Sequence, residues 1–460
     1  MTARVVVVGG GVSGLTVAYR LLQADATLDV TVLEAADEPV GKLAETEVGG
    51  LRLPAGADSF LARKPWAVDL CRELGLALES PSGGGAWLWT DRGLVPFAAD
   101  TAFGIPGDVG QVLRWPGVSR AGRRRALADL VKAKRRGTDD ESLGSLLRRR
   151  LGDEVAERAV GPLLAGLYAG DMDRLSVRAT FPELATWEAS QGSLIRGAQA
   201  ALRTQRQAVE PGPLFQRPVG GVGALPRALA HRLGDRVRTR AAASGVEPRG
   251  SRWTVRTDAD AIDADAVVLA VPADATVGLL RSATPAAAAD LAAIPLVSTA
   301  VVLLVYPEDT ASVLPDGTGF VVPRGAAPMT AATWLSAKWP DPAFGSRAVL
   351  RCYVGAAGEE GVVEESDDDI VAACARHLTA LLPLPASPAQ AAVIRWRRAM
   401  PQYELDHLDR VARLRAALPP GVFVSGQPYD GVGVPDCVRA AGEQAAAVLA
   451  HLEPVQETQP

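Results

Sequence analysis

Cysteine is scarce in this 460-residue sequence, which contains only four. They stand far apart, with no Cys-x-x-Cys pair and no neighbouring histidine: Cys71, Cys352, Cys374 and Cys437. This spacing argues against a disulfide scaffold or a structural zinc site and is typical of a reducing compartment. We therefore expect buried thiols, no metal site and a cytoplasmic location.

Long apolar runs are also missing. No stretch reaches the roughly 18 apolar residues of a membrane-spanning helix. The longest candidate, Val297 to Tyr306, includes Ser298 and Thr299, and its β-branched composition favours a buried strand. We expect no transmembrane segment and, because the first strand begins almost at Met1, no secretory signal. Peripheral contact with a membrane stays open.

An excess of positive charge is absent, since 48 Lys and Arg face 53 Asp and Glu for a net charge of −5. That balance gives no reason to expect a nucleic-acid partner. Arginine is nevertheless clustered at Arg123–Arg125 and Arg148–Arg150. These clusters could bind anionic groups or lipid headgroups, although a solvated helix face is the simpler interpretation.

The amino-terminal residues carry a nucleotide-binding pattern. A β-branched run from Arg4 to Gly9 leads into Gly9-Gly10-Gly11-Val12-Ser13-Gly14, and a helix is expected over Leu15 to Gln23. Glycines in this spacing permit a tight turn, close approach of a pyrophosphate and close helix–strand packing. A second strand, Asp29 to Leu33, ends at Glu34, whose carboxylate can accept from ribose hydroxyls. Together these features predict an ADP-binding unit that serves either NAD or FAD.

The segment after the second strand favours FAD. Glu38-Pro39-Val40-Gly41-Lys42 partly matches the Arg-x-Gly-Gly-[Arg/Lys] segment of large two-domain flavoproteins, with Glu38 and Val40 as the departures. Lys42 could contact a phosphate or ribose of the cofactor, or it could be an ordinary surface lysine.

The remaining pattern alternates between helical and strand-rich stretches, and the length suggests more than one domain. Strands are expected at Ala300–Tyr306, Gly319–Pro323, Ala331–Leu335 and Ala348–Val354, in a mostly antiparallel sheet. Helices are expected over Leu146–Tyr168, Ala224–Leu233 and Asp368–Leu382. The predicted fold class is α/β, with a Rossmann-like FAD-binding domain, a mixed α+β substrate domain and a helical insertion. The expected division is FAD-binding domain 1–65, 206–272 and 391–452; substrate domain 66–94 and 273–390; helical insertion 95–205; and tail 453–460.

Six segments, in order along nearly the whole chain, carry a family likeness: Val8–Leu15, Gly56–Lys64, Gly166–Asp171, Gly317–Val321, Met400–Tyr403 and Gly431–Cys437. Through them the chain resembles the bacterial FAD-dependent porphyrinogen oxidases, specifically the coproporphyrinogen III oxidases, within the wider fold group of the monoamine oxidases. The segments around Tyr168 and Pro435 are more specific than the nucleotide motif. Asp58 follows Ala57, where a Pro-acidic pair is commoner in the family.

The resemblance, with the nucleotide motif, implies the following cofactor-binding residues: Gly9, Gly10, Gly11, Val12, Ser13, Gly14, Glu34, Ala35, Lys42, Gly56, Ala57, Asp58, Ser59, Val246, Trp396, Gly433, Val434, Pro435 and Asp436. It implies a substrate cavity lined by Lys64, Leu167 and Tyr353. A helix that begins near Val434 would direct its positive end at the isoalloxazine, where negative charge builds on reduction.

The activity implied is oxygen-dependent oxidation of coproporphyrinogen III to coproporphyrin III, with hydrogen peroxide as by-product. No catalytic side chain is named, because His231, His377 and His407 lie in contexts typical of satisfied structural histidines. Transient contact with a heme-pathway chelatase would fit this role.

Three alternatives stay open. The first is oxidation of protoporphyrinogen IX. The second is another enzyme on the same fold, although only 5% of the residues are aromatic and no aromatic cage for an amine is legible. The third is a non-catalytic flavin-binding partner that hands porphyrin intermediates to a chelatase.

Overall fold

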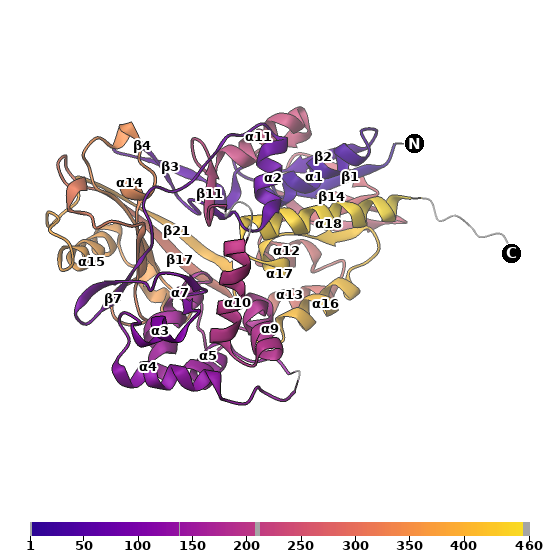
Figure 1. The fold of residues 1–460 in the computed structure, drawn as a ribbon. Helices are drawn as coiled ribbons and strands as arrows, with labels where there is room; N and C mark the ends of the chain where they lie inside the picture. Colours follow the sequence, from indigo (N-terminus) through magenta and orange to yellow (C-terminus); the bar gives the residue numbers. More distant parts are fainter. Residues whose placement is uncertain (1, 138, 208–211, 454–460) are drawn as a thin grey trace.

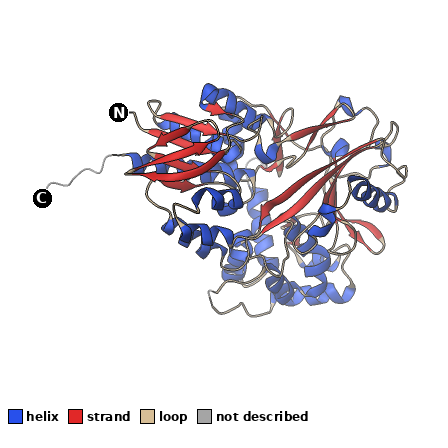
Figure 2. Cartoon of the chain, turned by 180° about the vertical axis from the view of Figure 1, so that it is seen from behind, coloured by secondary structure: helices blue, strands red, loops and turns tan. Residues whose placement is uncertain are grey.

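The computed structural model describes residues 2–137, 139–207 and 212–453, and the predicted tail lies outside this part apart from Glu453. Two large sheets, several smaller ones and a group of helices make up the described part of the molecule (Figures 1 and 2). All four cysteines are buried and free, as the sequence predicts. Among the described residues, no helix combines the length and the apolar character needed to cross a membrane.

A parallel sheet of five strands contains the nucleotide motif. In spatial order its strands are β12 Val237–Arg238, β2 Asp29–Leu33, β1 Arg4–Val8, β16 Ala266–Leu269 and β22 Val422–Val424. Its central strand is buried on both faces, which explains its continuous valine run. Val5 and Val7 belong to the hydrophobic core on one face, and Val6 and Val8 belong to the core on the other.

Helices cover one face of this sheet: α1 Val12–Ala24, α2 Pro65–Glu73, α11 Ala224–Leu233 and α18 Val434–Leu452. The other face packs against a three-stranded sheet and three further helices: β13 Ala243–Arg249, β14 Arg252–Thr257, β15 Ala261–Ala264, α12 Ala273–Leu280, α13 Pro285–Ala292 and α16 His407–Ala417. The predicted helix Leu15–Gln23 in fact begins at Val12, inside the glycine motif, so that Gly14 lies in its first turn.

The second sheet has seven strands, antiparallel except where β18 pairs with β7 (Figure 2). In spatial order they are β21 Gln390–Pro401, β17 Leu296–Val305, β20 Val349–Val354, β19 Met329–Trp334, β18 Gly319–Val321, β7 Trp87–Thr90 and β8 Gly93–Pro96. The four predicted strands are present with shifted ends, and β21, which the sequence analysis did not predict, lies at the edge. Helix α15, Asp367–Thr379, packs on this sheet and ends before the predicted Leu382.

The predicted helical insertion is mainly helical: α3 Val109–Leu113, α4 Arg120–Leu127, α5 Leu143–Leu151, α6 Asp153–Val155, α7 Gly161–Gly166, α8 Val177–Thr180, α9 Pro182–Gln191 and α10 Leu194–Gln207. It also contains two short paired strands, β9 Thr101–Ala102 and β10 Ile105–Pro106. The structure corrects the continuous helix expected over Leu146–Tyr168, because Gly152, where φ is 95°, interrupts it. After Gly152 the chain is helical from Asp153 to Gly166, with a π-helical segment at Ala156–Val160 between α6 and α7.

Further elements are short: β3 Glu45–Val48, β4 Leu51–Pro54, β5 Phe60–Leu61, β6 Leu78–Glu79, β11 Phe215–Pro218, α14 Leu335–Lys338 and α17 Gln427–Asp430. The strands of the parallel sheet come from three separate stretches of sequence, in the order expected for an interrupted cofactor domain. The exact domain boundaries stay a prediction.

Candidate functional site

At both ends of the glycine motif, at Gly9 and Gly14, the protein's own backbone requires a glycine. Gly9 has a φ of +111°, and a Cβ there would lie 2.6 Å from the carbonyl oxygen of Ala270. A Cβ on Gly14 would lie 2.0 Å from the carbonyl oxygen of Gly9. Both distances are far below van der Waals contact, so these positions are fixed by the turn and by helix–strand packing.

Gly11 differs from these two glycines. Its backbone is extended, with φ −78° and ψ 179°, and it caps α1 without any side-chain hydrogen bond. A Cβ there would meet only Gly41 Cα, at 3.8 Å. The fold itself therefore does not require glycine at this position, whereas a pyrophosphate approaching the helix N-terminus would.

Glu34 is held at the tip of β2. One carboxylate oxygen accepts the Gly10 N–H at 2.6 Å, and the other accepts the Ala36 N–H at 2.8 Å. Each oxygen keeps acceptor capacity for a ribose hydroxyl, while Ala35 beside it is exposed. An open turn at a helix N-terminus and an anchored carboxylate at the next strand tip fit the ADP half of FAD.

Lys42 is turned toward the carboxyl-terminal part of the chain. Its ammonium donates to the carbonyl of Ala399 and, at 2.6 Å, to Oε1 of Gln427. Burial lowers the pKa of Lys42 to about 8. The surface-lysine alternative is therefore wrong, while contact between Lys42 and the cofactor stays a prediction.

The segment Ala55–Ser59 lies against one face of the seven-stranded sheet. The Trp396 indole donates to the carbonyl of Ala55 at 2.8 Å, and the Arg351 guanidinium donates to the carbonyl of Gly56 at 2.7 Å. Side chains of paired strands share a face, and the β17 pairings place Tyr353 and Trp396 on this one. The structure thus brings together three groups predicted separately, namely Gly56–Ser59, Trp396 and Tyr353.

The Asp58 side chain points into the protein. Its Oδ2 accepts from Lys338 at 2.9 Å and from the Trp339 indole at 3.1 Å. Burial alone would raise the pKa of Asp58, but the charges of Arg351 and Lys338 outweigh it and hold that pKa well below its usual range. Any contact of Asp58 with a cofactor is consequently left to its main chain.

Another part of the predicted site gathers at the start of α18. Gly433 is the N-cap, and Val434 and Pro435 are buried in the first turn. Asp436 follows and accepts from Lys64 through both oxygens, at 2.7 and 2.9 Å. The predicted substrate cation and a predicted flavin neighbour are therefore an ion pair.

The other predicted residues differ in exposure. Leu167 follows α7 and is 55% exposed, which suits an apolar wall open to a ligand. Tyr353 is half-buried, and its hydroxyl contacts Arg351. The Val246 side chain is buried in the core below the parallel sheet, so a contact with adenine would come from its main chain.

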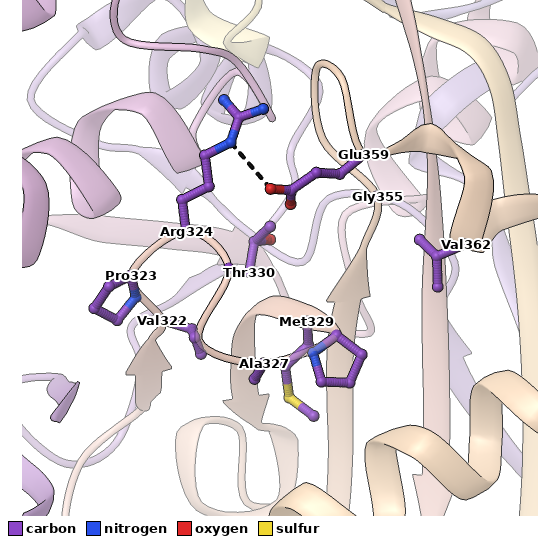
Figure 3. A pocket seen from close by; sticks show the side chains of 11 residues that line it. Val322, Pro323, Arg324, Ala327, Met329, Thr330, Gly355, Glu359 and Val362 are labelled. Atoms are coloured by element: carbon purple, nitrogen blue, oxygen red, sulfur yellow. Dashed lines mark hydrogen bonds and ion pairs between the residues drawn. The ribbon is translucent and has the colours of Figure 1, made fainter. Parts of the chain in front are cut away.

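A small cleft of about 130 Å³ lies elsewhere, between the β18–β19 connection and the loop after β20 (Figure 3). Arg324 crosses its rim and pairs with Glu359 at 3.0 Å and with Asp171 at 3.5 Å. The volume is below the roughly 300–1,000 Å³ of ordinary small-molecule sites. We regard it as a junction between loops.

Comparison with known proteins adds to this geometry. The model of the family described as flavin containing amine oxidoreductase matches residues 12–449. The chain belongs to this family. Membership confirms the flavin cofactor and the α/β flavoprotein fold expected from the sequence.

Similar proteins extend over nearly the whole chain. A coproporphyrinogen III oxidase of Bacillus subtilis (strain 168) is 33% identical, with 97% of this chain and 98% of the relative covered. A coproporphyrinogen III oxidase of Mycobacterium bovis is 37% identical, with 97% of each covered. A crystal structure from Exiguobacterium sp. 255-15, provisionally described as a protoporphyrinogen oxidase, is 30% identical with a TM-score of 0.86 and covers 97% of this chain and 99% of that one.

Sequence reasoning missed two residues that hold this flavoprotein's candidate site together, Lys338 and Arg351. A charged residue inside the buried strand β20 was the available signal for Arg351. The structure also corrects the expectation that His407 is a satisfied structural histidine. Its side chain is fully buried, and its ring stacks on that of Tyr403 with 3.9 Å between the ring centroids. Neither ring nitrogen has a hydrogen-bond partner among the described residues.

Proposed function

We propose that this chain oxidises coproporphyrinogen III to coproporphyrin III with bound FAD. This proposal rests on the similarity of the chain to bacterial coproporphyrinogen III oxidases, which extends over almost the full length of this chain and of each relative. The chemistry and exposure of the three residues proposed to contact the substrate support the proposal, since they are a partly exposed cation, an exposed leucine and a half-buried tyrosine: Lys64, Leu167 and Tyr353.

FAD supplies a two-electron acceptor when bound. The protein's part is to fix the cofactor and hold the reacting C–H bond beside it, away from water. Trp396 and Arg351 fix the Ala55–Ser59 backbone, which we assign to the flavin. Tyr353 supplies aromatic surface to the flat macrocycle from the same sheet face, and Leu167 supplies apolar surface.

Aromatisation of a porphyrinogen removes six electrons and six protons, which three oxygen molecules take up as three hydrogen peroxide. We assign no side-chain base, and the pyrrole N–H protons pass to water. Oxygen as acceptor, a cytoplasmic location and transient contact with a heme-pathway chelatase belong to the same proposal.

The test is anaerobic mixing of the holoprotein with coproporphyrinogen III. We expect the visible absorbance of the oxidised flavin to be lost, and to return when oxygen is admitted, with three hydrogen peroxide per coproporphyrin formed. A flavin that stays oxidised with every porphyrinogen would instead favour the non-catalytic partner.

Protoporphyrinogen IX is a second candidate substrate, favoured by the description of the Exiguobacterium structure. It carries two vinyl groups in place of two propionates, so pairing with Lys64 alone does not separate the two substrates. Steady-state kinetics on both, compared as kcat/KM, decides between them.

A further inference from the structure

Two cationic side chains and one carboxylate are buried together at the Ala55–Ser59 segment, to which the carboxylate, Asp58, belongs. Lys338 Nζ lies 2.9 Å from Asp58 Oδ2, and Arg351 lies 3.5 Å from Asp58 Oδ1. The side chains of Asp58, Lys338 and Arg351 are only 7%, 11% and 2% exposed. We call these three residues the charge cluster.

The charge cluster has two cations and one carboxylate. Within the described part of the chain, Asp58 is the only acidic partner of either cation. The other partners are neutral: Ser59, the Gly56 carbonyl and the Tyr353 hydroxyl. Arg217 stacks on Trp339 nearby but is neutralised by Glu79 at 2.7 Å. One positive charge is therefore left over.

An uncompensated buried charge is costly unless a partner of opposite sign offsets it. The cations are too well covered for a substrate carboxylate to reach them, so their influence on a ligand acts through the electric field. A low-dielectric interior screens such a field weakly.

The position of the charge cluster indicates which ligand feels this field. Arg351 of the charge cluster donates to the Gly56 carbonyl. Gly56 itself lies against the backbone of Lys42, since a Cβ built on Gly56 would lie 1.9 Å from the Lys42 carbonyl oxygen. Lys42 follows Gly41, which in turn abuts Gly11 in the nucleotide turn. Only the backbone of the Ala55–Ser59 segment therefore lies between the two buried cations and the path assigned to FAD.

We propose that Lys338 and Arg351 are positioning residues for the flavin and that their excess positive charge stabilises its reduced form. Two-electron reduction with uptake of one proton leaves a flavin with one additional negative charge, which the cluster complements. This inference rests on the flavin site proposed above and is independent of which substrate is oxidised.

The test is the reduction potential of the holoprotein, measured without substrate against a reference dye. Lys338→Met removes the excess charge and leaves Asp58 paired with Arg351. We expect the preference for reduced over oxidised flavin to fall about tenfold, which is about 30 mV for a two-electron couple. Lys338→Arg should keep the original potential, as should Lys134→Met, which alters an exposed lysine of the helical insertion.

Asp58→Asn should move the potential in the opposite direction, because it raises the excess charge by one. The double variant Asp58→Asn/Lys338→Met restores the original net charge and should return the potential to its original value. If these residues had only a structural role, the reduction potentials of Lys338→Met and Asp58→Asn would shift in the same direction or not at all. Either result overturns the proposal. The double variant gives the same decision if Asp58→Asn alone fails to fold.

Discussion

At the residue scale, Lys64 has two partners to consider: the Asp436 carboxylate in the structure and a propionate of the proposed substrate. It is 38% exposed, and both oxygens of Asp436 accept from its ammonium. A propionate that pairs with Lys64 must therefore share it with Asp436. Lys64→Ala removes the substrate's partner, so we expect KM to rise about tenfold, the equivalent of about 1.4 kcal/mol.

The FAD content of Lys64→Ala should stay normal, and Lys64→Arg should recover most of the affinity because it keeps the charge. Lys132→Ala is the matched control, since this lysine is exposed and, among the described residues, its ammonium donates only to the carbonyl of Arg149. An unchanged KM in Lys64→Ala would show that Lys64 serves Asp436 alone.

Single residues were predictable where their partners are close in sequence. Glu34 could be assigned because the strand that ends at it lies only 24 residues beyond Gly10. The partners of Asp58 could not be assigned, since Lys338 lies 280 residues further along the chain. No local pattern indicates that the carboxylate points into the protein and meets two cations.

At the scale of elements, Arg150 joins several parts of the helical insertion. It lies on α5, is fully buried, and donates to Asp129 Oδ1 at 2.5 Å and to the Gly192 carbonyl at 2.5 Å. Asp129 also accepts from Ser193 at 2.5 Å. Within the cluster Arg148–Arg150, Arg150 therefore connects elements inside the protein, which corrects the solvated-face interpretation for this residue.

Arg150→Met should lower the free energy of unfolding by about 3–5 kcal/mol, because it leaves the buried Asp129 carboxylate without its cation. Urea denaturation followed by tryptophan fluorescence measures the change. Arg124→Met, on the exposed side of α4, should change the free energy of unfolding by less than about 0.5 kcal/mol. An equally small loss in Arg150→Met would mean that water or relaxation satisfies Asp129.

Elements with strong patterns were predicted well, and their interruptions were not. β2 and α11 have the predicted ends, because turn residues bound a clear apolar pattern. β21 was missed because its alternation is broken by charged residues on an edge strand, including Arg398 at a positive φ of 47°. The break at Gly152 was missed because helical spacing continues on both sides.

At the scale of the whole molecule, the proposed cofactor site forms only when stretches distant in sequence come together. The nucleotide turn, the Ala55–Ser59 segment, β21 and the start of α18 all contribute predicted contacts. A ligand that binds this assembly and not the unfolded chain stabilises the fold by about 2.7 kcal/mol at a hundredfold excess over its Kd. Removal of FAD should therefore lower Tm, and added FAD should restore it.

Gly11 and Gly14 separate the needs of the fold from the needs of the cofactor. Gly11→Ala meets no backbone closer than 3.8 Å, so the Tm of the FAD-free protein should be unchanged. Its methyl group enters the space assigned to the pyrophosphate, so the rise in Tm on adding FAD should shrink. Gly14→Ala forces a 2.0 Å contact with Gly9 and should lower Tm with or without FAD. Thermal scans at matched FAD concentrations measure both effects, and a full FAD response in Gly11→Ala would place the pyrophosphate elsewhere.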